Sequence, residues 1–207
     1  RGPCQHPSLQ GIGAAGQPGT RVQVAAAGRK TVFGQDEWVD LTLGQMIERV
    51  ACLFPDQYAV KYTTRDYTRT YREFLDEVDR VARGLLAIGV RPGDHVAVWA
   101  TNHPEWLLSF FACGRIGAIL VTVNTSYKIH EAEYLLRQSD THTLGMMDSF
   151  KDAHYTEILQ EICPELATAD PARPSSPRLP PLRRAVCSTR LPPGGHVEPV
   201  GDGLRAS

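Results

Sequence analysis

Three glycines near the start of the chain have the spacing of a nucleotide-binding loop. Gly11, Gly13 and Gly16 match G-x-G-x-x-G, a pattern that lets a backbone approach a pyrophosphate at the N-terminus of a helix. That chemistry requires a strand before the glycines and a helix after them. Pro7 and Pro18 flank the motif instead, and proline disfavours both elements. We therefore expect a chance match, and a nucleotide-dependent oxidoreductase ranks third among the interpretations.

Carboxylates and imidazoles are the next candidates for acid–base or metal chemistry. Glu105, Glu131 and Glu133 have the right side chain for proton transfer. We interpret Glu105 as a helix-capping residue and the other two as helix-face charges, because helix termini and faces account for them without a substrate. The histidines show no H-x-x-x-H or other metal-ligand spacing. We expect surface or capping positions for His6, His95, His103, His130, His142, His154 and His196.

Cysteine usage indicates a reducing compartment. The five cysteines are odd in number, widely spaced and without a C-x-x-C pair, which disfavours a disulfide framework or a zinc site. We expect Cys113, in an apolar stretch, to be a small core residue. The sequence Asn124-Thr-Ser126 fits the glycosylation sequon, but it carries little weight without a secretory signal.

The motifs that handle phosphate groups are missing from the sequence. It contains no G-x-x-x-x-G-K-[ST], no G-x-S-x-G and no Ser/Thr/Gly-rich loop that runs into a lysine. Reactions of ATP or CoA need aligned N–H donors and a cation to balance phosphate charge. We therefore predict no catalytic, cofactor-binding or metal-binding residue in this chain.

Length and charge narrow the class further. The chain has 207 residues and a net charge of −1, which gives no overall attraction to nucleic acid or to an anionic membrane. No run approaches the ~18 apolar residues of a membrane span. The length allows one domain of ordinary size with tails, or two small domains. We expect no nucleic-acid partner and no transmembrane segment.

The clearest structural pattern lies at residues 93–124, which read as strand, helix and strand. Two short apolar runs, 95–100 and 118–123, flank an apolar helical stretch at 106–113. Two buried strands joined by a helix form a βαβ crossover, which implies a parallel sheet covered by helices.

Capping signals mark where helices begin and end. We predict Asn102 as the N-cap of the central helix, with Pro104 just inside it and Gly117 at its end. Two earlier helices begin at S/T-x-x-E/Q capping boxes, formed by Thr42 with Gln45 and by Thr70 with Glu73.

Alternation of the remaining elements predicts the fold class. The helix from Thr42 places Leu43, Ile47 and Val50 on one apolar face. From Thr70 onward helices and strands alternate, which specifies an α/β fold: a partial doubly wound, mostly parallel sheet with flanking helices. The further predicted elements are a hairpin of strands 58–62 and 67–70, helices from Thr70 to Gly89, at 130–137 and at 154–163, and a strand at 143–147.

Composition divides the chain into three zones. Residues 1–36 are rich in Gly, Ala, Pro and Gln and are expected to be flexible. Residues 38–168 carry the dense pattern. Residues 170–207 are expected to be a disordered Pro/Arg-rich tail, because residues 171–207 hold eight prolines, four glycines, six arginines and no lysine. The abrupt change suggests that residues from about Cys187 to Ser207 are an out-of-frame translation.

The central zone resembles the N-terminal part of AMP-forming acyl-CoA synthetases, which belong to the adenylate-forming ligases. The likeness runs from about Leu41 to about Leu166. The stretch 119–127 is most similar to medium- and long-chain fatty acid ligases. The matching residues, in chain order, are Gly89, Gly93, Asp94, Val96, Ala97, Val98, Asn102, Glu105, Trp106, Gly117, Asn124, Tyr127, Glu131, Leu135 and Ser139.

The resemblance implies an ATP-dependent ligase that activates a fatty acid as acyl-adenylate and transfers it to CoA. It implies ATP, Mg²⁺ and CoA as cofactors of the parent protein. The family's phosphate loop, hinge and catalytic lysine come after the matched region, so no catalytic residue transfers. We expect this chain to be an N-terminal piece, inactive alone and without tight cofactor binding.

Two further expectations complete the interpretation. A bacterial cytoplasm is the first-ranked location, and the mitochondrial matrix is the second. The alternative function is a non-catalytic α/β module whose Pro/Arg-rich tail binds a partner. Neither acyl chain length nor oligomeric state follows from the sequence.

Overall fold

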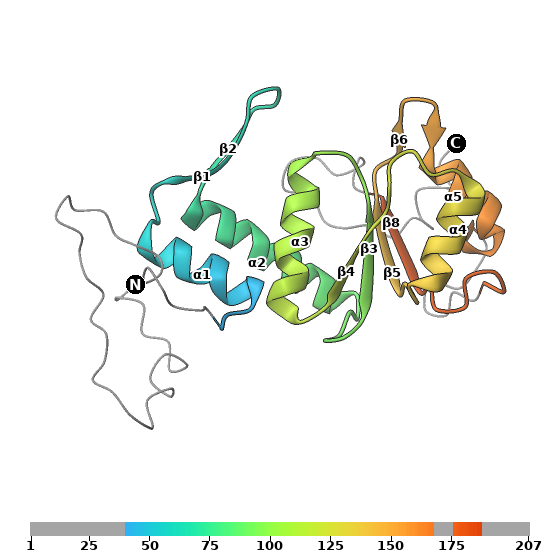
Figure 1. Cartoon of the computed structure of the whole chain (residues 1–207), viewed down its shortest axis with the longest axis horizontal. Helices are drawn as coiled ribbons and strands as arrows, with labels where there is room; N and C mark the ends of the chain where they lie inside the picture. Colours follow the sequence, from blue (N-terminus) through green and yellow to red (C-terminus); the bar gives the residue numbers. More distant parts are fainter. Residues whose placement is uncertain (1–39, 168–175, 188–207) are drawn as a thin grey trace.

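The computed structural model describes residues 40–167 and 176–187, which form an α/β layered fold (Figure 1). The main sheet has the strand order β4-β3-β5-β8, and all of its neighbouring strands are parallel. The chain runs from β3 to β4 on one side and then returns to β5 on the other side. The prediction of a doubly wound, mostly parallel sheet with flanking helices is therefore confirmed.

The opening βαβ prediction is confirmed in its elements. Strand β3 (His95–Trp99) leads through helix α3 (Pro104–Ile116) to strand β4 (Ile119–Thr122). Helix α4 (Ile129–Gln138) then returns the chain to β5 (Thr143–Met146). The elements that follow are β6 (Ser149–Phe150), β7 (Ala153–His154), α5 (Tyr155–Ile162), η2 (Pro164–Ala167) and β8 (Arg184–Cys187).

A smaller unit precedes the sheet in the chain. Its antiparallel hairpin of β1 and β2 stands beside helices α1 and α2, which pack together and against α3 (Figure 1). Both predicted capping boxes are present. The Thr42 and Thr70 side chains accept from the backbone amides of the N3 residues, and the N3 side chains accept from the backbone amides of Thr42 and Thr70. The elements are α1 (Leu43–Leu53), β1 (Tyr58–Tyr62), β2 (Tyr67–Thr70) and α2 (Tyr71–Ala87).

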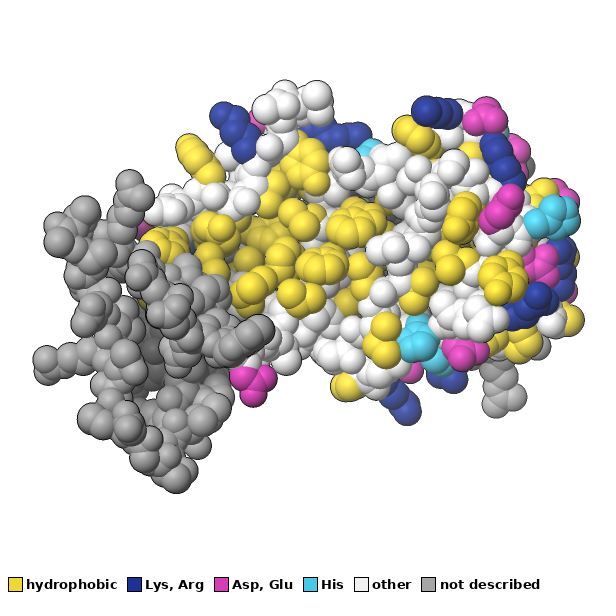
Figure 2. Space-filling model, viewed as in Figure 1, with side chains coloured by type: hydrophobic (Ala, Val, Ile, Leu, Met, Phe, Trp, Pro, Cys, Tyr) yellow, Lys and Arg dark blue, Asp and Glu magenta, His cyan; other side chains and the backbone are white. Residues whose placement is uncertain are grey.

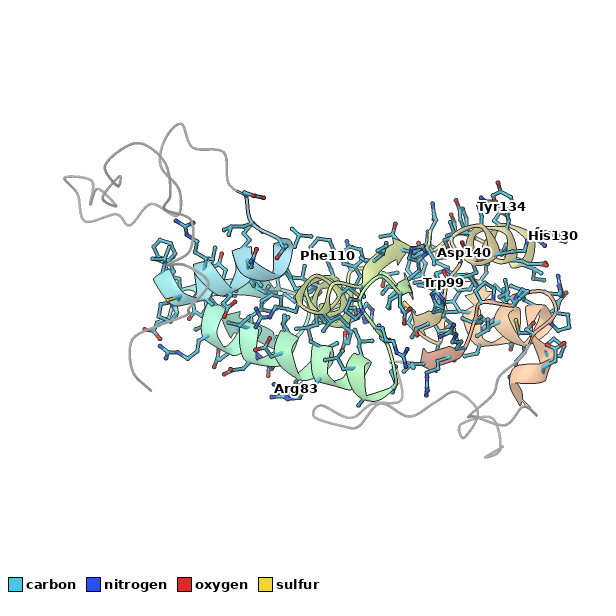
Figure 3. The ribbon with its side chains drawn as sticks, turned by 90° about the horizontal axis from the view of Figure 1, so that it is seen from below. Arg83, Trp99, Phe110, His130, Tyr134 and Asp140 are labelled. Atoms are coloured by element: carbon cyan, nitrogen blue, oxygen red, sulfur yellow. The ribbon has the colours of Figure 1, made fainter. Side chains whose placement is uncertain are left out.

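Side-chain alternation along β3 builds two separate layers of core. Ala97 and Trp99 join the cluster that α4 and α5 cover, and Trp99 stacks on Tyr155 with ring centroids 4.2 Å apart. Figure 3 shows Trp99 beside these two helices. Val96 lies on the opposite face with Cys113 of α3. Successive residues of a strand point to opposite faces, so both faces of the sheet are apolar.

The buried face of α1 differs from the prediction. Gly44, Ile47 and Ala51 are buried, whereas Leu43 is 44% exposed. The physical reason is a close backbone approach to α3, because a Cβ on Gly44 would lie 2.7 Å from the carbonyl oxygen of Gly114. Glycine permits this approach. Of the three residues predicted for the apolar face, Ile47 is therefore buried, whereas Gly44 and Ala51 take the places expected for Leu43 and Val50.

The N-terminus of α3 also differs by one residue. The N-cap is His103 rather than Asn102, and its side chain makes no capping hydrogen bond. Pro104 occupies the first helical position, where its missing N–H costs nothing. The predicted end is confirmed, because Gly117 has φ 73 in the left-handed region.

The prediction of a disordered tail from residue 170 is wrong for residues 176–187. They turn back to the sheet, where β8 pairs in parallel with β5 from Thr143↔Arg184 to Met146↔Cys187. β8 is an edge strand, a position that tolerates the prolines just before it. The other tail residues and the flexible segment predicted at 1–36 lie outside the described residues.

An arginine in the last turn of α3 joins this helix to both helices of the smaller unit. Arg115 Nε donates to Asp79 of α2 at 2.9 Å, and Nη1 donates to Glu48 of α1 at 2.9 Å. Side chains of these three residues are 23–34% exposed. None of the helices in the described part of the chain combines the length and apolar character of a membrane-spanning segment.

Candidate functional site

An apolar groove with a volume of about 150 Å³ lies between the sheet and helices α2 and α3. We call it the sheet-face groove. Figure 2 shows many apolar side chains on the part of the surface that lies over α1–α3, and charged side chains gathered over α4 and α5. The apolar residues that line the groove include Val81 and Leu85 of α2 with Ile88 just after that helix, Val96, Val98, Met146 and Val186 of the strands, and Trp106 and Leu108 of α3.

Three sequence features build this groove. Val81 and Leu85 are four residues apart, so they lie on one face of α2. Val96 and Val98 are two residues apart and share one face of β3. Val186 is brought in by β8, next to β5. The floor of the groove therefore depends on the strand that the sequence did not predict.

Helix α3 contributes apolar residues on more than one side. Phe111 packs against Phe74 of α2, with ring centroids 5.7 Å apart. Trp106 stacks on Phe110, with centroids 5.9 Å apart, and Figure 3 shows Phe110 on the side of α3 away from α2. A helix that is apolar all round is typically buried on all sides in a larger protein.

Polar side chains in the groove are few and already engaged. Ser109 Oγ donates to the carbonyl oxygen of Glu105 at 2.7 Å, a common contact of serine with the preceding turn. The Glu105 side chain is 56% exposed, and its carboxylate lies 3.9 Å from His103 Nδ1. Thr143 is buried at the start of β5. The groove therefore suits an apolar chain and contains no arranged nucleophile.

The carboxyl edge of the sheet is a second candidate, because open parallel sheets bind ligands where the strand order reverses. That reversal lies between β3 and β5. There the amide and hydroxyl of Thr101 lie 3.4 and 3.7 Å from the Met147 sulfur. Trp99 Nε1 donates to the Asn124 carbonyl at 3.1 Å. These polar groups of Thr101 and Trp99 are engaged in contacts within the fold, so the groove is the stronger candidate.

The glutamates considered for acid–base chemistry lie apart and have structural partners. Glu131 accepts from the Lys128 amide at 3.2 Å and caps α4. Glu133 binds Arg178 through two hydrogen bonds, and this guanidinium lowers the pKa of the Glu133 carboxyl. Glu105 lies in the first turn of α3, beyond the N-cap. The structure does not bring the three into one site.

The five described histidines are also separated from one another, with one exception. The rings of His95 and His142 lie at the amino ends of β3 and β5, with centroids 6.2 Å apart, and His95 N donates to His142 Nδ1. Figure 3 shows His130 at the outer end of α4. Within residues 40–167 and 176–187, no group of three or more His, Cys, Asp or Glu residues is arranged to hold a metal ion.

His103 has a partner that sequence reasoning missed. Arg65, at the tip of the β1–β2 hairpin, lies with Nη2 2.8 Å from His103 Nε2. Burial and this guanidinium lower the pKa of His103. The two residues are 38 positions apart, and no spacing rule connects them.

The remaining candidates have structural roles. Asn124 Oδ1 accepts from the Ser126 amide at 3.0 Å and from its hydroxyl at 2.8 Å, which forms a turn at the sequon. Cys113 is buried, as predicted, and burial raises the pKa of its thiol to about 11. Gly11, Gly13 and Gly16 lie outside the described residues.

The cofactors implied by the resemblance do not fit the lining of the sheet-face groove. ATP and Mg²⁺ require phosphate-facing N–H groups, a cation and oxygen ligands. The sheet-face groove offers almost entirely apolar side chains. No nucleotide chemistry is therefore assigned to residues of the described part of this chain.

Comparisons with known proteins agree with one another. Residues 47–182 match the family described as AMP-binding enzyme. YngI of Bacillus subtilis (strain 168), which has a provisional acyl-CoA synthetase name, is 43% identical over 150 residues, covering 72% of this chain and 27% of YngI. The mitochondrial medium-chain acyl-CoA ligase ACSF2 of Danio rerio is 36% identical over 163 residues, covering 79% of this chain and 26% of ACSF2.

A solved structure extends the likeness to three dimensions. The crystal structure of the anthranilate CoA ligase AuaEII in complex with anthranoyl-AMP has a TM-score of 0.59 and 25% identity to this chain. The match covers 80% of this chain and 27% of AuaEII. This chain thus spans about a quarter of the length of the curated relatives that it matches.

Proposed function

Because the chain belongs to the acyl-CoA ligase group of the AMP-binding enzyme family, we propose that it is the first part of an ATP-dependent fatty acid–CoA ligase. In the proposed reaction a fatty acid carboxylate attacks the α-phosphorus of ATP, pyrophosphate leaves, and an acyl-adenylate forms. The sulfur of CoA then attacks the acyl carbon, its proton is released, and AMP leaves. The family match over residues 47–182 is the observation that carries this proposal.

The role of this chain within that protein is structural. Its residues build a parallel sheet with apolar faces and one apolar groove. The groups that balance phosphate charge, including Mg²⁺ ligands, belong in this proposal to other parts of the parent protein. Mg²⁺ would reduce the charge repulsion that opposes attack on a phosphate.

The proposed substrate is a medium- or long-chain fatty acid. Support comes from the name of the ACSF2 relative, a medium-chain acyl-CoA ligase, and from the apolar character of the described surface near α2 and α3. The location follows the relatives, of which one is bacterial and one is named mitochondrial. We rank the bacterial cytoplasm first and the mitochondrial matrix second.

An exchange assay tests the division of roles. The purified 207-residue chain, incubated with ATP, Mg²⁺, labelled pyrophosphate and octanoate or palmitate, is expected to give no fatty-acid-dependent ATP–pyrophosphate exchange. A protein extended to the length of its relatives, by reading the flanking nucleotides in all three frames, is expected to give exchange with one of these acids. Exchange by the chain alone overturns the assigned role. No exchange by the extended protein, or no ligase sequence in any frame, overturns the proposed function.

The alternative of a non-catalytic module with a Pro/Arg-rich binding tail has less support. Part of that tail is the edge strand β8, and Arg178 binds Glu133 of α4 instead of facing a partner. A measurement that distinguishes the two is the oligomeric and folding behaviour of the isolated chain. A monodisperse protein with cooperative unfolding favours the module.

A further inference from the structure

The tip of the β1–β2 hairpin, residues 63–66, is joined to the start of α3 by a side-chain contact between Arg65 and His103. Directly behind the tip, strand β2 is attached to α2, because Tyr67 Oη and Arg69 Nε both donate to Glu77 at 2.6 Å. Tyr67 pairs with Tyr62 next to the turn. At the tip, Arg65 reaches His103, the N-cap of α3. The hairpin pairs with no other strand of the described residues. The Arg65–His103 contact therefore links the tip to α3, while Glu77 of α2 holds the adjacent end of β2.

The chemistry of this contact fixes the protonation state of His103. An arginine guanidinium only donates hydrogen bonds. With Arg65 Nη2 2.8 Å away, His103 Nε2 must therefore accept and cannot carry a proton. The ring proton is then on Nδ1, which lies 3.9 Å from a carboxylate oxygen of Glu105. A second proton on Nε2 removes the acceptor and places two cations side by side.

Charged and titratable groups from both packed elements surround this ring. From the hairpin, Arg65 opposes a positive His103, and so does the positive end of the α3 macrodipole. From α3, Glu105 favours it. The nearby Tyr62 and Tyr67 hydroxyls, whose pKa values are raised by burial, are neutral at any pH where histidine titrates. Because burial and Arg65 prevail, the pKa of His103 lies below its ordinary value of 6.5.

We propose that His103 is an acid-sensitive latch: its neutral ring holds the hairpin tip against α3, and its protonation releases the tip. The latch stands one helical turn from the groove, since the Trp106 amide donates to the His103 carbonyl at 3.1 Å. Glu105 and Trp106 both line the groove. Release of the tip therefore changes the surroundings of one end of the sheet-face groove.

Hydrogen exchange on the full chain tests the latch. Amide exchange of a peptide spanning residues 62–67 is followed by mass spectrometry from pH 7.5 to pH 4.5 and corrected for the intrinsic pH dependence. The expected result is protection at neutral pH that falls below pH 6.5, by about tenfold per pH unit as one proton is taken up. Protection that stays constant over this range overturns the proposal.

Variants separate His103 from other titrating groups. His103→Gln supplies an amide oxygen that accepts from Arg65 and does not titrate, so the tip should stay protected throughout. Arg65→Ala should expose the tip at pH 7.5 as acid does in the wild type. The control Arg72→Ala, which removes an exposed ion pair with Asp56, should keep the wild-type midpoint. The latch is overturned if His103→Gln loses protection at the same acid midpoint as the wild type. It is also overturned if acid removes protection throughout α2 and α3 in both the wild type and His103→Gln.

Discussion

At the scale of single residues, two glycines set how closely α1 and α3 approach. The position of a Cβ on Gly44 lies 2.7 Å from a backbone oxygen of Gly114 and 3.0 Å from the Arg115 Cα. Backbone atoms cannot move aside as the end of a flexible side chain does. The close approach in turn lets the Arg115 guanidinium reach Glu48 of α1 and Asp79 of α2.

Gly44→Ala is expected to destabilise the chain by about 1–3 kcal/mol, the usual cost of overpacking a tight interface. The matched control is Gly84→Ala in α2, where an added Cβ meets nothing within 4 Å. That change should stabilise by about 0.5–1 kcal/mol, because alanine loses less backbone entropy in a helix. Urea unfolding followed by circular dichroism measures both. A neutral Gly44→Ala would contradict the close approach.

At the scale of elements, an arginine anchors the segment that leads into β8. Arg178 Nε donates to Glu133 of α4 at 3.1 Å, and Nη1 donates to the Glu161 carbonyl of α5 at 3.0 Å. Leu179 and Leu182, on either side of two prolines, are fully buried in the main core. These contacts hold a proline-rich segment in place and let a short strand pair with β5.

Glu133→Gln is expected to speed amide exchange in residues 184–187, because the neutral amide holds Arg178 less strongly. The control is Glu131→Gln on the same helix, where glutamine can still accept from the Lys128 amide and preserve the cap. Exchange rates measured at pH 7 should change in the first variant only. Equal rates in the two variants would show that β8 does not depend on this anchor.

The same pair gives the segment a pH dependence. Arg178 lowers the pKa of Glu133 below its ordinary value of 4.5. The folded state therefore binds fewer protons than the unfolded chain near that pH, so the contribution of the pair is complete above pH 4.5 and is lost as pH falls through the folded value. Acid should therefore accelerate amide exchange of residues 184–187 less in Glu133→Gln than in the wild type.

At the scale of the whole molecule, apolar surface is left in contact with solvent. The sheet-face groove opens on one side of the sheet, and Trp106 and Phe110 form a half-buried stack on α3. Soluble proteins rarely leave large contiguous apolar patches exposed unless another surface covers them. A chain that spans about a quarter of its relatives' length is in keeping with such a surface.

The isolated chain is therefore expected to self-associate or to bind a hydrophobic dye. Val81→Glu places a carboxylate in the groove and should reduce dye fluorescence several-fold. The control Tyr58→Glu changes a hairpin residue that is 71% exposed and does not line the groove, so it should leave dye fluorescence unchanged. Dye titration together with light scattering gives both readouts. A monodisperse wild-type chain that leaves the dye dark would show that the surface is covered within this chain.

Much of the secondary structure followed from local sequence signals. The capping boxes at Thr42 and Thr70 and the left-handed Gly117 mark helix boundaries within a few residues of themselves. Residue type alone misplaced the N-cap of α3. Asparagine is a preferred N-cap residue, so Asn102 was predicted, but the neighbouring His103 occupies the N-cap position. The tail prediction was wrong over β8 because proline content describes local backbone preference and not the edge strand that a sheet can accept.

The sequence by itself determined the order of helices and strands, the α/β class and the resemblance to acyl-CoA synthetases, since hydrophobic periodicity and caps act over three to seven residues. Only the tertiary structure decided which face of α1 is buried, that β8 completes the sheet, that two helices and the sheet enclose an apolar groove, and that Arg65 meets His103. The physical reason is that these features are contacts between segments far apart in the chain. Backbone approach, strand pairing and packing fix such contacts, and no spacing within one segment records them.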